Sequence, residues 1–72
     1  MSEQVLKLGN DEYIRLGDAL KAAGVTDTGG QAKIMIQEGC VYVDGKICTM
    51  RGAKIRAGQV IKAADMTVRV EA

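Results

Sequence analysis

Apolar and polar residues alternate in several short runs of this chain, which is the pattern of half-buried strands. Between two of these runs, the Asp44-Gly45 pair favours a type I′ hairpin turn, because both central positions of that turn need a positive φ. A second hairpin turn is expected near Ala64-Asp65. The strands expected on this basis are residues 5–8, 13–16, 41–43, 46–48, 59–63 and 67–70.

Two segments have the spacing of short helices instead. Gly17-Asp18 is expected to open a helix over residues 19–23, and Gly24 is expected to end it. Residues 31–38 are expected to form a second helix, since apolar side chains recur there at i, i+3 and i+4.

The fold class that follows is α+β, with two short helices packed on a small, mostly antiparallel sheet. Without proline, low-complexity sequence or internal repeats to suggest a linker, one domain over residues 1–72 is expected. The expected core comprises Leu16, Leu20, Ala32, Met35, Ile36, Val41, Val43, Ile55, Val60 and Val68.

Two large side chains fall outside this core. Ile34 lies around the second helix from its apolar stripe, so we expect the N-terminal strand to cover it; exposure on a contact surface is the alternative. Tyr42 lies on the hairpin face opposite Val41 and Val43. Half-buried packing on the sheet is expected for Tyr42, and stacking on a bound base is the alternative.

The hairpin register separates Cys40 from Cys48. With a two-residue turn at Asp44-Gly45, Val41 faces Cys48 and Cys40 faces Thr49, so the two sulfur atoms point to opposite sides of the hairpin. We therefore expect two free thiols, as suits a reducing compartment.

Composition argues against an enzyme. A chain of 72 residues buries a small core and leaves little room for a large catalytic cleft. It has no His and two Cys, too few for a four-ligand zinc site, and no motif pairs a nucleophile with a base. We expect no enzymatic activity, no metal or other cofactor, and no small-molecule substrate.

Hydropathy argues against a membrane location. No run approaches the roughly 20 apolar residues of a membrane span. Residues 1–9 lack the basic start and long apolar run of a signal peptide. A cytoplasmic protein without membrane association is expected.

Basic residues are concentrated in one segment, although the net charge is only +1. All 9 acidic residues lie outside residues 46–62, and this asymmetry is the footprint of an anionic partner. A solvated loop that happens to be basic is the alternative. The basic residues of the segment are Lys46, Arg51, Lys54, Arg56 and Lys62.

Gly29 and Gly30 stand where the second helix is expected to begin, although glycine weakens a helix by about 1 kcal/mol relative to alanine. A helix start exposes N–H groups that attract anions, and glycine lets a phosphate approach the backbone without meeting a Cβ. Lys33 follows one turn later. This arrangement suits a phosphate backbone; a P-loop is excluded because GxxxxGK[ST] is absent. The alternative is that one glycine has a positive φ in the turn between the helices.

Residues 15–63 resemble the S-four RNA-binding domain, named after a small-subunit ribosomal protein, and are most similar to its short stand-alone bacterial members. The matching positions are Arg15-Leu16, Leu20, Gln31-Ala32-Lys33, Gly39, Val41, Val43, Gly45-Lys46 and Gly58.

The resemblance implies an RNA-binding surface made by the first two helices and the turn of the following hairpin. This surface corresponds to residues 28–33 and 44–46, to which the basic segment adds charge. The implied partner is structured RNA, with ribosomal RNA or ribosomal particles as the expected source. The candidate RNA-binding residues are Arg15, Thr28, Gly29, Gly30, Gln31, Lys33, Asp44, Gly45, Lys46, Arg51, Lys54 and Arg56.

Four positions depart from the family pattern. Gly29 stands where an Arg is usual, which removes one phosphate or base contact from the helix start. Asp44 replaces the Asn of the hairpin turn, Gln59 replaces an Asp, and Gly17 intrudes before Asp18.

Aromatic content indicates the kind of RNA. Single-strand binders stack bases on several aromatic side chains, whereas this chain has only Tyr13 and Tyr42. Recognition of structured RNA through phosphates and shape is therefore expected.

Two other classes of function are alternatives to RNA binding. A protein-interaction module would use Ile34, Tyr42 and Ile47 as an apolar patch. A small sulfur or acyl carrier resembles this chain in size, but such carriers end in a free Gly-Gly tail, and the Gly-Gly pair here is internal.

Overall fold

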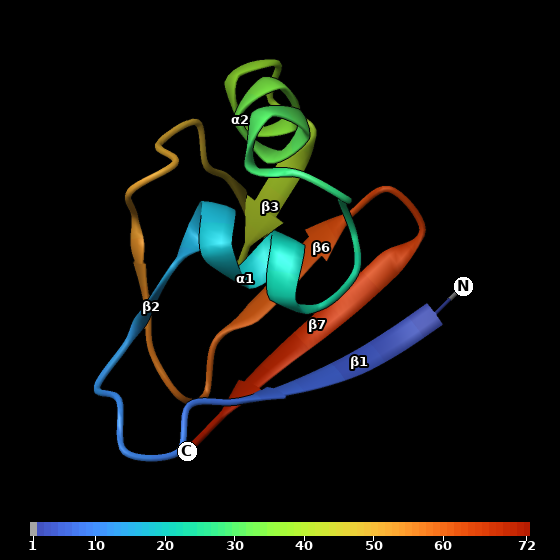
Figure 1. Ribbon diagram of the computed structural model, residues 1–72. Coiled ribbons are helices and arrows are strands. Elements are labelled where there is room, and N and C mark those ends of the chain that lie inside the picture. Colours follow the sequence, from blue (N-terminus) through green and yellow to red (C-terminus); the bar gives the residue numbers. More distant parts are fainter. Residues whose placement is uncertain (1) are drawn as a thin grey trace.

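Two sheets and two helices make up the computed structural model, which describes residues 2–72. The strand order of the larger sheet is β1-β7-β6-β3-β4, and a separate two-stranded sheet pairs β2 with β5 (Figure 1). The predicted α+β architecture is confirmed. In chain order the elements are β1 (Ser2–Lys7), β2 (Ile14–Arg15), α1 (Leu16–Ala22), α2 (Gly29–Gln37), β3 (Val41–Val43), β4 (Lys46–Ile47), β5 (Lys54–Ile55), β6 (Val60–Ala63) and β7 (Met66–Glu71).

The larger sheet is antiparallel except at one edge, where β1 runs parallel to β7. β1 is the edge strand beside β7, and this edge of the sheet is remote from α2 (Figure 1). An exposed ion pair between Arg69 Nε and Glu3 Oε1, at 2.9 Å, links these two strands. A surface pair of this kind contributes little to stability.

The first hairpin has the predicted register. Tyr42 pairs with Ile47 and Val43 pairs with Lys46, and the turn residues Asp44 and Gly45 have φ angles of 52° and 85°. Positive φ at both positions is the condition for a type I′ turn.

Both thiols are free, as this register requires, with Cys40 exposed and Cys48 half-buried against the core. The second predicted hairpin is also present, since Ala63 pairs with Met66 across the turn at Ala64-Asp65.

The lengths of several elements differ from the prediction. α1 and α2 each begin earlier than expected, at Leu16 and Gly29. In α1 the first N–H groups are satisfied by carbonyls of a distant loop, and in α2 the Thr28 side chain caps the helix start by accepting from the Gln31 N–H. The strand predicted over residues 13–16 is reduced to β2. Its partner β5 was predicted to be loop, because two residues are too short for an alternating pattern to be recognised.

The core joins both helices to the inner face of the larger sheet. Met35, Val43 and Val60 were predicted to belong to it but are only half-buried. The prediction failed in β6 because it chose the wrong phase of the strand: Ile61, which pairs with Val68, points inward in place of Val60. The buried apolar residues are Leu8, Leu16, Ala19, Leu20, Ala32, Ile36, Val41, Ile55, Ile61, Ala63, Val68 and Val70.

Ile34 and Tyr42 are both exposed, contrary to the prediction. Ile34 is 56% exposed, because the strand expected to cover it pairs with β7 and does not reach α2. Tyr42 is 41% exposed, since it lies on the face of β3 opposite the buried Val41.

Candidate nucleic-acid interface

The start of α2 carries a side-chain cap on each side of its two glycines. Thr28 Oγ1 accepts a hydrogen bond from the Gln31 N–H at 3.2 Å, and Gln31 Oε1 accepts one from the Asp27 N–H at 3.0 Å. This reciprocal arrangement resembles a capping box, which stabilises the helix start. Thr28 and Gln31, both predicted to contact RNA, therefore have a structural role in the helix.

Gly29 and Gly30 occupy the first turn of α2 with ordinary backbone angles. Neither belongs to the glycines with positive φ, so the alternative explanation for the pair is wrong. A Cβ at Gly29 would meet nothing within 4 Å, and a Cβ at Gly30 would meet only Thr28 Oγ1 at 3.9 Å. Within residues 2–72 their N–H groups have no hydrogen-bond acceptor. The bare backbone at this helix start is therefore open to an approaching group.

The start of α1 is capped by a loop that is distant in sequence. Arg15 is the N-cap residue and its side chain makes no capping hydrogen bond. Instead, the Leu16 N–H donates to the Ala53 carbonyl at 2.9 Å and the Gly17 N–H donates to the Arg51 carbonyl at 3.1 Å. Two N–H groups that a helix leaves unsatisfied are thereby paired, and residues 51–53 are held against α1.

These two helix starts and the loop enclose a hollow of about 300 Å³. Arg15 and Arg51 contribute guanidinium groups to it, and Gly29 contributes part of the open start of α2. Asp18 lines the α1 side. The complete lining is Arg15, Gly17, Asp18, Gly29, Arg51 and Gly52.

A second basic side chain lies directly across from Arg15. In the β2–β5 sheet, Arg15 and Lys54 are cross-strand partners, and both are exposed. Like charges at directly opposed positions destabilise a strand pair. A positive charge at a helix N-terminus is also unfavourable, and Arg15 holds that position in α1.

Tyr13 connects Lys54 to Arg56. Lys54 Nζ lies 5.0 Å from the centroid of the Tyr13 ring, and Arg56 Cζ lies 6.0 Å from it, both within cation–π range. Arg15, Arg51, Lys54 and Arg56 thus form a continuous set of neighbours, here called the basic strip. Tyr13 could not be recognised from the sequence as part of this set, because the pairing of β2 with β5 was not predicted.

Asp44 holds the hairpin turn to the segment after the basic strip. Its Oδ1 accepts a hydrogen bond from the Val60 N–H at 3.0 Å, and its Oδ2 accepts one from Gln59 Nε2 at 3.1 Å. Gln59 Oε1 in turn accepts a bond from the Arg56 N–H at 2.7 Å. The Val60 N–H and then the Gln59 amide lower the pKa of Asp44 below its ordinary value of 3.8. Asp44, predicted to contact RNA, thus has a structural role in the turn.

The remaining predicted residues lie apart from the basic strip. Lys33 on α2, and Gly45 and Lys46 at the hairpin, are exposed, but none of them lines the hollow between the helix starts. In the described part of the chain the only ion pair joins Arg69 to Glu3, so no carboxylate neutralises the basic strip through an ion pair.

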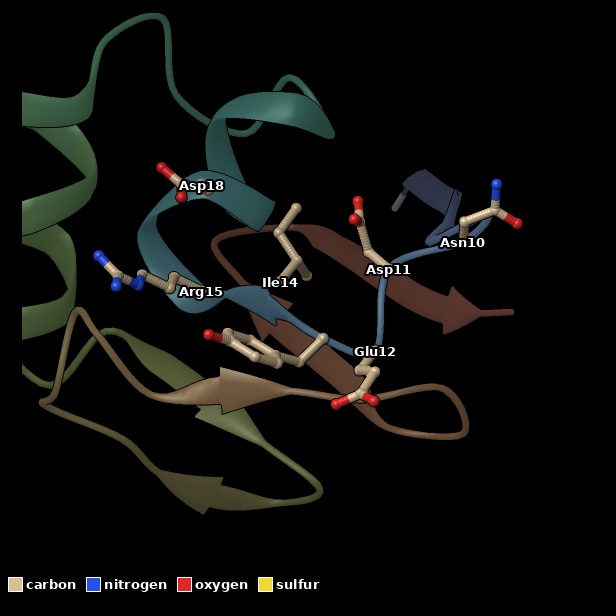
Figure 2. Close-up of a pocket in the computed structure, with 7 residues that line it drawn as sticks. Asn10, Asp11, Glu12, Ile14, Arg15 and Asp18 are labelled. Carbon is tan, nitrogen blue, oxygen red and sulfur yellow. The ribbon is translucent and has the colours of Figure 1, made fainter.

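A larger hollow of about 490 Å³ lies on the other side of Arg15, and acidic side chains outnumber basic ones in its lining. Asp11, Glu12 and Asp18 contribute carboxylates to it. Figure 2 shows the Arg15 side chain pointing away from Asn10 and Asp11, toward the side of the molecule where α2 lies. The charge of Arg15 therefore belongs to the basic strip, and the acidic hollow is not suited to a polyanion.

Metal-ion clusters and membrane-spanning helices are both absent from residues 2–72. In that range no group of three or more His, Cys, Asp or Glu side chains is placed to hold a metal ion. No helix of the described chain is long and apolar enough to cross a bilayer.

Comparison with known proteins gives the family. Residues 6–71 match the model of the S4 domain, the domain that the sequence motifs resembled. This chain belongs to the S4 domain family. It is 45% identical over 65 residues to YbcJ of Escherichia coli strain K12, covering 90% of this chain and 93% of that protein. RNA binding is given in the name of that protein as a provisional function. The YbcJ protein of Shigella flexneri, which is named as uncharacterized, matches to the same extent.

The same relative has a known structure. The solution structure of YbcJ from Escherichia coli, described as revealing an αL motif involved in RNA binding, superimposes with a TM-score of 0.75 at 43% identity. The match covers 94% of this chain and 86% of that one.

Two of the departures from the S4 domain pattern concern side chains that contact each other. The pattern has Asn in the hairpin turn and Asp after the later glycine, whereas this chain has Asp44 and Gln59 at those positions. The two side chains are hydrogen-bonded at 3.1 Å, so a carboxylate and an amide face one another with their positions exchanged.

Replacing Asp44 by Asn should reduce the loss of stability in acid. Because the pKa of Asp44 is lowered on folding, its contribution is present above the unfolded pKa of 3.8 and is lost as pH falls through the lower folded pKa. Asn keeps an acceptor for the Val60 N–H and is compatible with the type I′ turn, but it does not titrate. Urea unfolding of both proteins from pH 6 downward, at about one-unit steps, measures the difference.

Asp65→Asn, in the other hairpin turn, is the control for loss of one carboxylate, since Asp65 has no side-chain hydrogen bond in the described chain. Aspartate side chains ordinarily titrate near about pH 4. If the stability curves of wild type and Asp44→Asn stay parallel below that pH, the role assigned to Asp44 is contradicted.

Proposed function

We propose that this S4 domain is an RNA-binding protein that recognises structured RNA through the basic strip and the open start of α2. The phosphate backbone would contact Arg15, Arg51, Lys54 and Arg56, and the unpaired N–H groups of Gly29 and Gly30 would donate hydrogen bonds to a phosphate oxygen. The provisional RNA-binding name of the Escherichia coli relative and the αL motif of its structure support this proposal.

The observation that carries the proposal is the direct pairing of Arg15 with Lys54. Folding places these two cations opposite each other, beside Arg51 and at a helix N-terminus, where each arrangement costs stability. A bound polyanion would offset this repulsion, because each cation would then also be attracted to a negative phosphate. An anionic partner therefore accounts for an arrangement that the fold alone does not require.

Structured RNA fits better than single-stranded RNA. The ring of Tyr13 is already in contact with Lys54 and Arg56, so Tyr42 is the remaining aromatic side chain with an exposed face. Single-strand binding by base stacking uses several such platforms. We propose ribosomal RNA or ribosomal particles as the source of the structured RNA, and the cytoplasm as the location.

Titration with two RNA probes tests the proposal. A stem–loop RNA and an unstructured uridine oligonucleotide of the same length are titrated at several salt concentrations, with binding followed by fluorescence anisotropy. The stem–loop should bind more tightly, and log affinity should fall linearly with log salt, by about 0.7–0.9 per phosphate contact. Failure to bind either probe at low salt would refute RNA binding.

Alanine at Gly29 and Gly30 should separate folding from binding. Each substitution should raise the free energy of unfolding by a few tenths to about 1 kcal/mol, since both sites have helical backbone angles and open space around the new methyl group. RNA affinity should fall, because each methyl group would stand where the phosphate approaches the N–H groups.

Urea unfolding and anisotropy on the two single variants measure both effects. Lys33→Ala, one turn further along α2, tests whether the helix contacts RNA beyond its start. Stabilised glycine variants that bind the stem–loop with wild-type affinity would remove the α2 start from the interface.

A protein-interaction function has one observation in its favour. Tyr42 and Ile47 are cross-strand partners and both are exposed, 41% and 58%, which places two large apolar side chains together on the outer face of the hairpin. Ile34 is also exposed, on α2. This alternative would be favoured if the chain bound another protein with an affinity that does not depend on salt, and bound neither RNA probe.

A further inference from the structure

We infer that Gly17 is a positioning residue for RNA binding: its missing Cβ makes the space in which the Arg51 side chain lies, and it thereby sets where the Arg51 guanidinium meets RNA. This inference rests on the proposed function and deepens it. It assigns a role to the residue that intrudes into the family pattern before Asp18.

The contact between the two residues is close. A Cβ built on Gly17 would lie 2.8 Å from Arg51 Cγ and 3.5 Å from Arg51 Cδ, and the Arg51 carbonyl would lie 3.7 Å away. A carbon–carbon separation of 2.8 Å is well below the optimum of about 3.5–4.0 Å, so the side chain would have to move. The affected atoms are in the middle of the Arg51 stem, and their displacement would carry the guanidinium with them.

Nothing else in the local structure requires glycine at this position. Gly17 is the second residue of α1, it is not among the glycines with positive φ, and it is buried. Alanine is the strongest helix former, so glycine weakens α1 at this point. The approach of the Arg51 stem is therefore the one described contact that a methyl group would disturb.

The hydrogen bonds around Gly17 fix the backbone on both sides of this contact. Its N–H donates to the Arg51 carbonyl at 3.1 Å, and the Leu16 N–H donates to the Ala53 carbonyl at 2.9 Å. Because both backbones are fixed, the collision between a methyl group on Gly17 and the Arg51 stem is relieved by rotation of the Arg51 side chain. Gly17→Ala should therefore keep the fold and move the charge out of the hollow that Arg51 shares with Arg15.

A double-mutant cycle tests the inference. Anisotropy titrations with the stem–loop RNA are run on wild type, Gly17→Ala, Arg51→Ala and the double variant, and circular dichroism is used to establish that each is folded. Arg51→Ala should lose about tenfold in affinity, the value of one charge-assisted contact. Gly17→Ala should lose most of the same factor, and adding it to Arg51→Ala should cause no further loss.

Thermal unfolding adds a readout that is independent of RNA. In the wild-type background, Gly17→Ala stabilises α1 through the better helix propensity of alanine but also makes the new methyl group collide with the Arg51 stem. In the Arg51→Ala background that collision is absent. The double variant should therefore melt at a higher temperature than Arg51→Ala alone. Gly30→Ala, at the corresponding second position of α2, is the matched control for the helix gain, because the new methyl group would meet only Thr28 Oγ1, at 3.9 Å.

Three outcomes overturn the inference. Wild-type affinity in Gly17→Ala together with weakened Arg51→Ala would show that Gly17 does not position the charge. Equal, additive losses in the cycle would assign Gly17 a separate effect. Wild-type affinity in Arg51→Ala would remove Arg51 from the interface while leaving RNA binding by the other residues intact. Failure of the proposed function can be distinguished from all three outcomes, because the wild-type protein itself would then bind no RNA.

Discussion

Replacing Arg51 and Lys54 together with alanine is expected to weaken binding of stem–loop RNA by about a hundredfold, as two charge-assisted contacts of about 1.4 kcal/mol each would require. The slope of log affinity against log salt should become shallower by about 0.7–0.9 for each lost contact. Arg51 lines the hollow beside the start of α2, and Lys54 lies across from Arg15. The loss should be similar for different stem–loop sequences, because phosphates carry no sequence information.

Two further variants control for charge. Lys7→Ala removes an exposed cation from β1, on the far side of the sheet from α2, and should leave affinity and slope nearly unchanged (Figure 1). Asp18→Asn removes the carboxylate that lines the same hollow as Arg51 and should strengthen binding. If Lys7→Ala weakens binding as much as either strip residue does, the interaction depends on net charge and the basic strip has no special position.

The largest effect on stability is expected for Ile36→Ala. Ile36 lies on the inner side of α2 with no exposed surface, packed among the core residues of the sheet. Truncating a fully buried Ile costs about 2–5 kcal/mol, which is a large part of the roughly 5–15 kcal/mol that stabilises a small domain. Urea unfolding at neutral pH measures the change.

Ile34→Ala is the matched control on the same helix. Ile34 is 56% exposed, and alanine is the better helix former, so the free energy of unfolding should change by less than about 0.5 kcal/mol. A large loss at Ile34 would mean that something covers this side chain in solution, which would return attention to a second copy or another protein.

Local patterns in the sequence were sufficient for the hairpins and for the helix positions. The Asp44-Gly45 pair determined both the turn type and the register, so the separation of the two thiols followed from it. These predictions succeeded because the relevant energies, turn angles and strand alternation, involve neighbouring residues. The S4 domain family was likewise evident from motifs that are close in sequence.

The parts that were missed depend on contacts between distant segments. The first N–H groups of α1 are satisfied by carbonyls of Arg51 and Ala53, and no pattern near residue 17 indicates this. Ile34 was wrongly expected to be covered by the N-terminal strand, because local sequence does not show which strand β1 pairs with. The phase of β6 was wrong for a similar reason, since Val60 and Ile61 are both apolar and only the pairing of Ile61 with Val68 decides between them.

The candidate interface was predicted only in part. Charge alone pointed to Arg51, Lys54 and Arg56, but their arrangement depends on Tyr13 and on the β2–β5 pair. Residue type also misled, since Thr28 and Gln31 have side chains suited to RNA but use them to cap α2. Their contact with RNA stays a prediction, as does that of Lys33 and Lys46.

The capping of α1 by a distant loop bears on the order in which the chain folds. α1 has seven residues, starts with an N-cap that makes no side-chain hydrogen bond, and has glycine in its first turn, so it would have almost no helicity as an isolated segment. It acquires its missing hydrogen bonds only when residues 51–53 arrive. During synthesis, a nascent chain that stops short of this loop would expose an unformed α1 and an incomplete basic strip. The proposed interface would thus stay incomplete until residues 51–53 have been synthesised, and the amides at Leu16 and Gly17 should exchange with solvent only when this loop opens away from α1 or the whole domain unfolds.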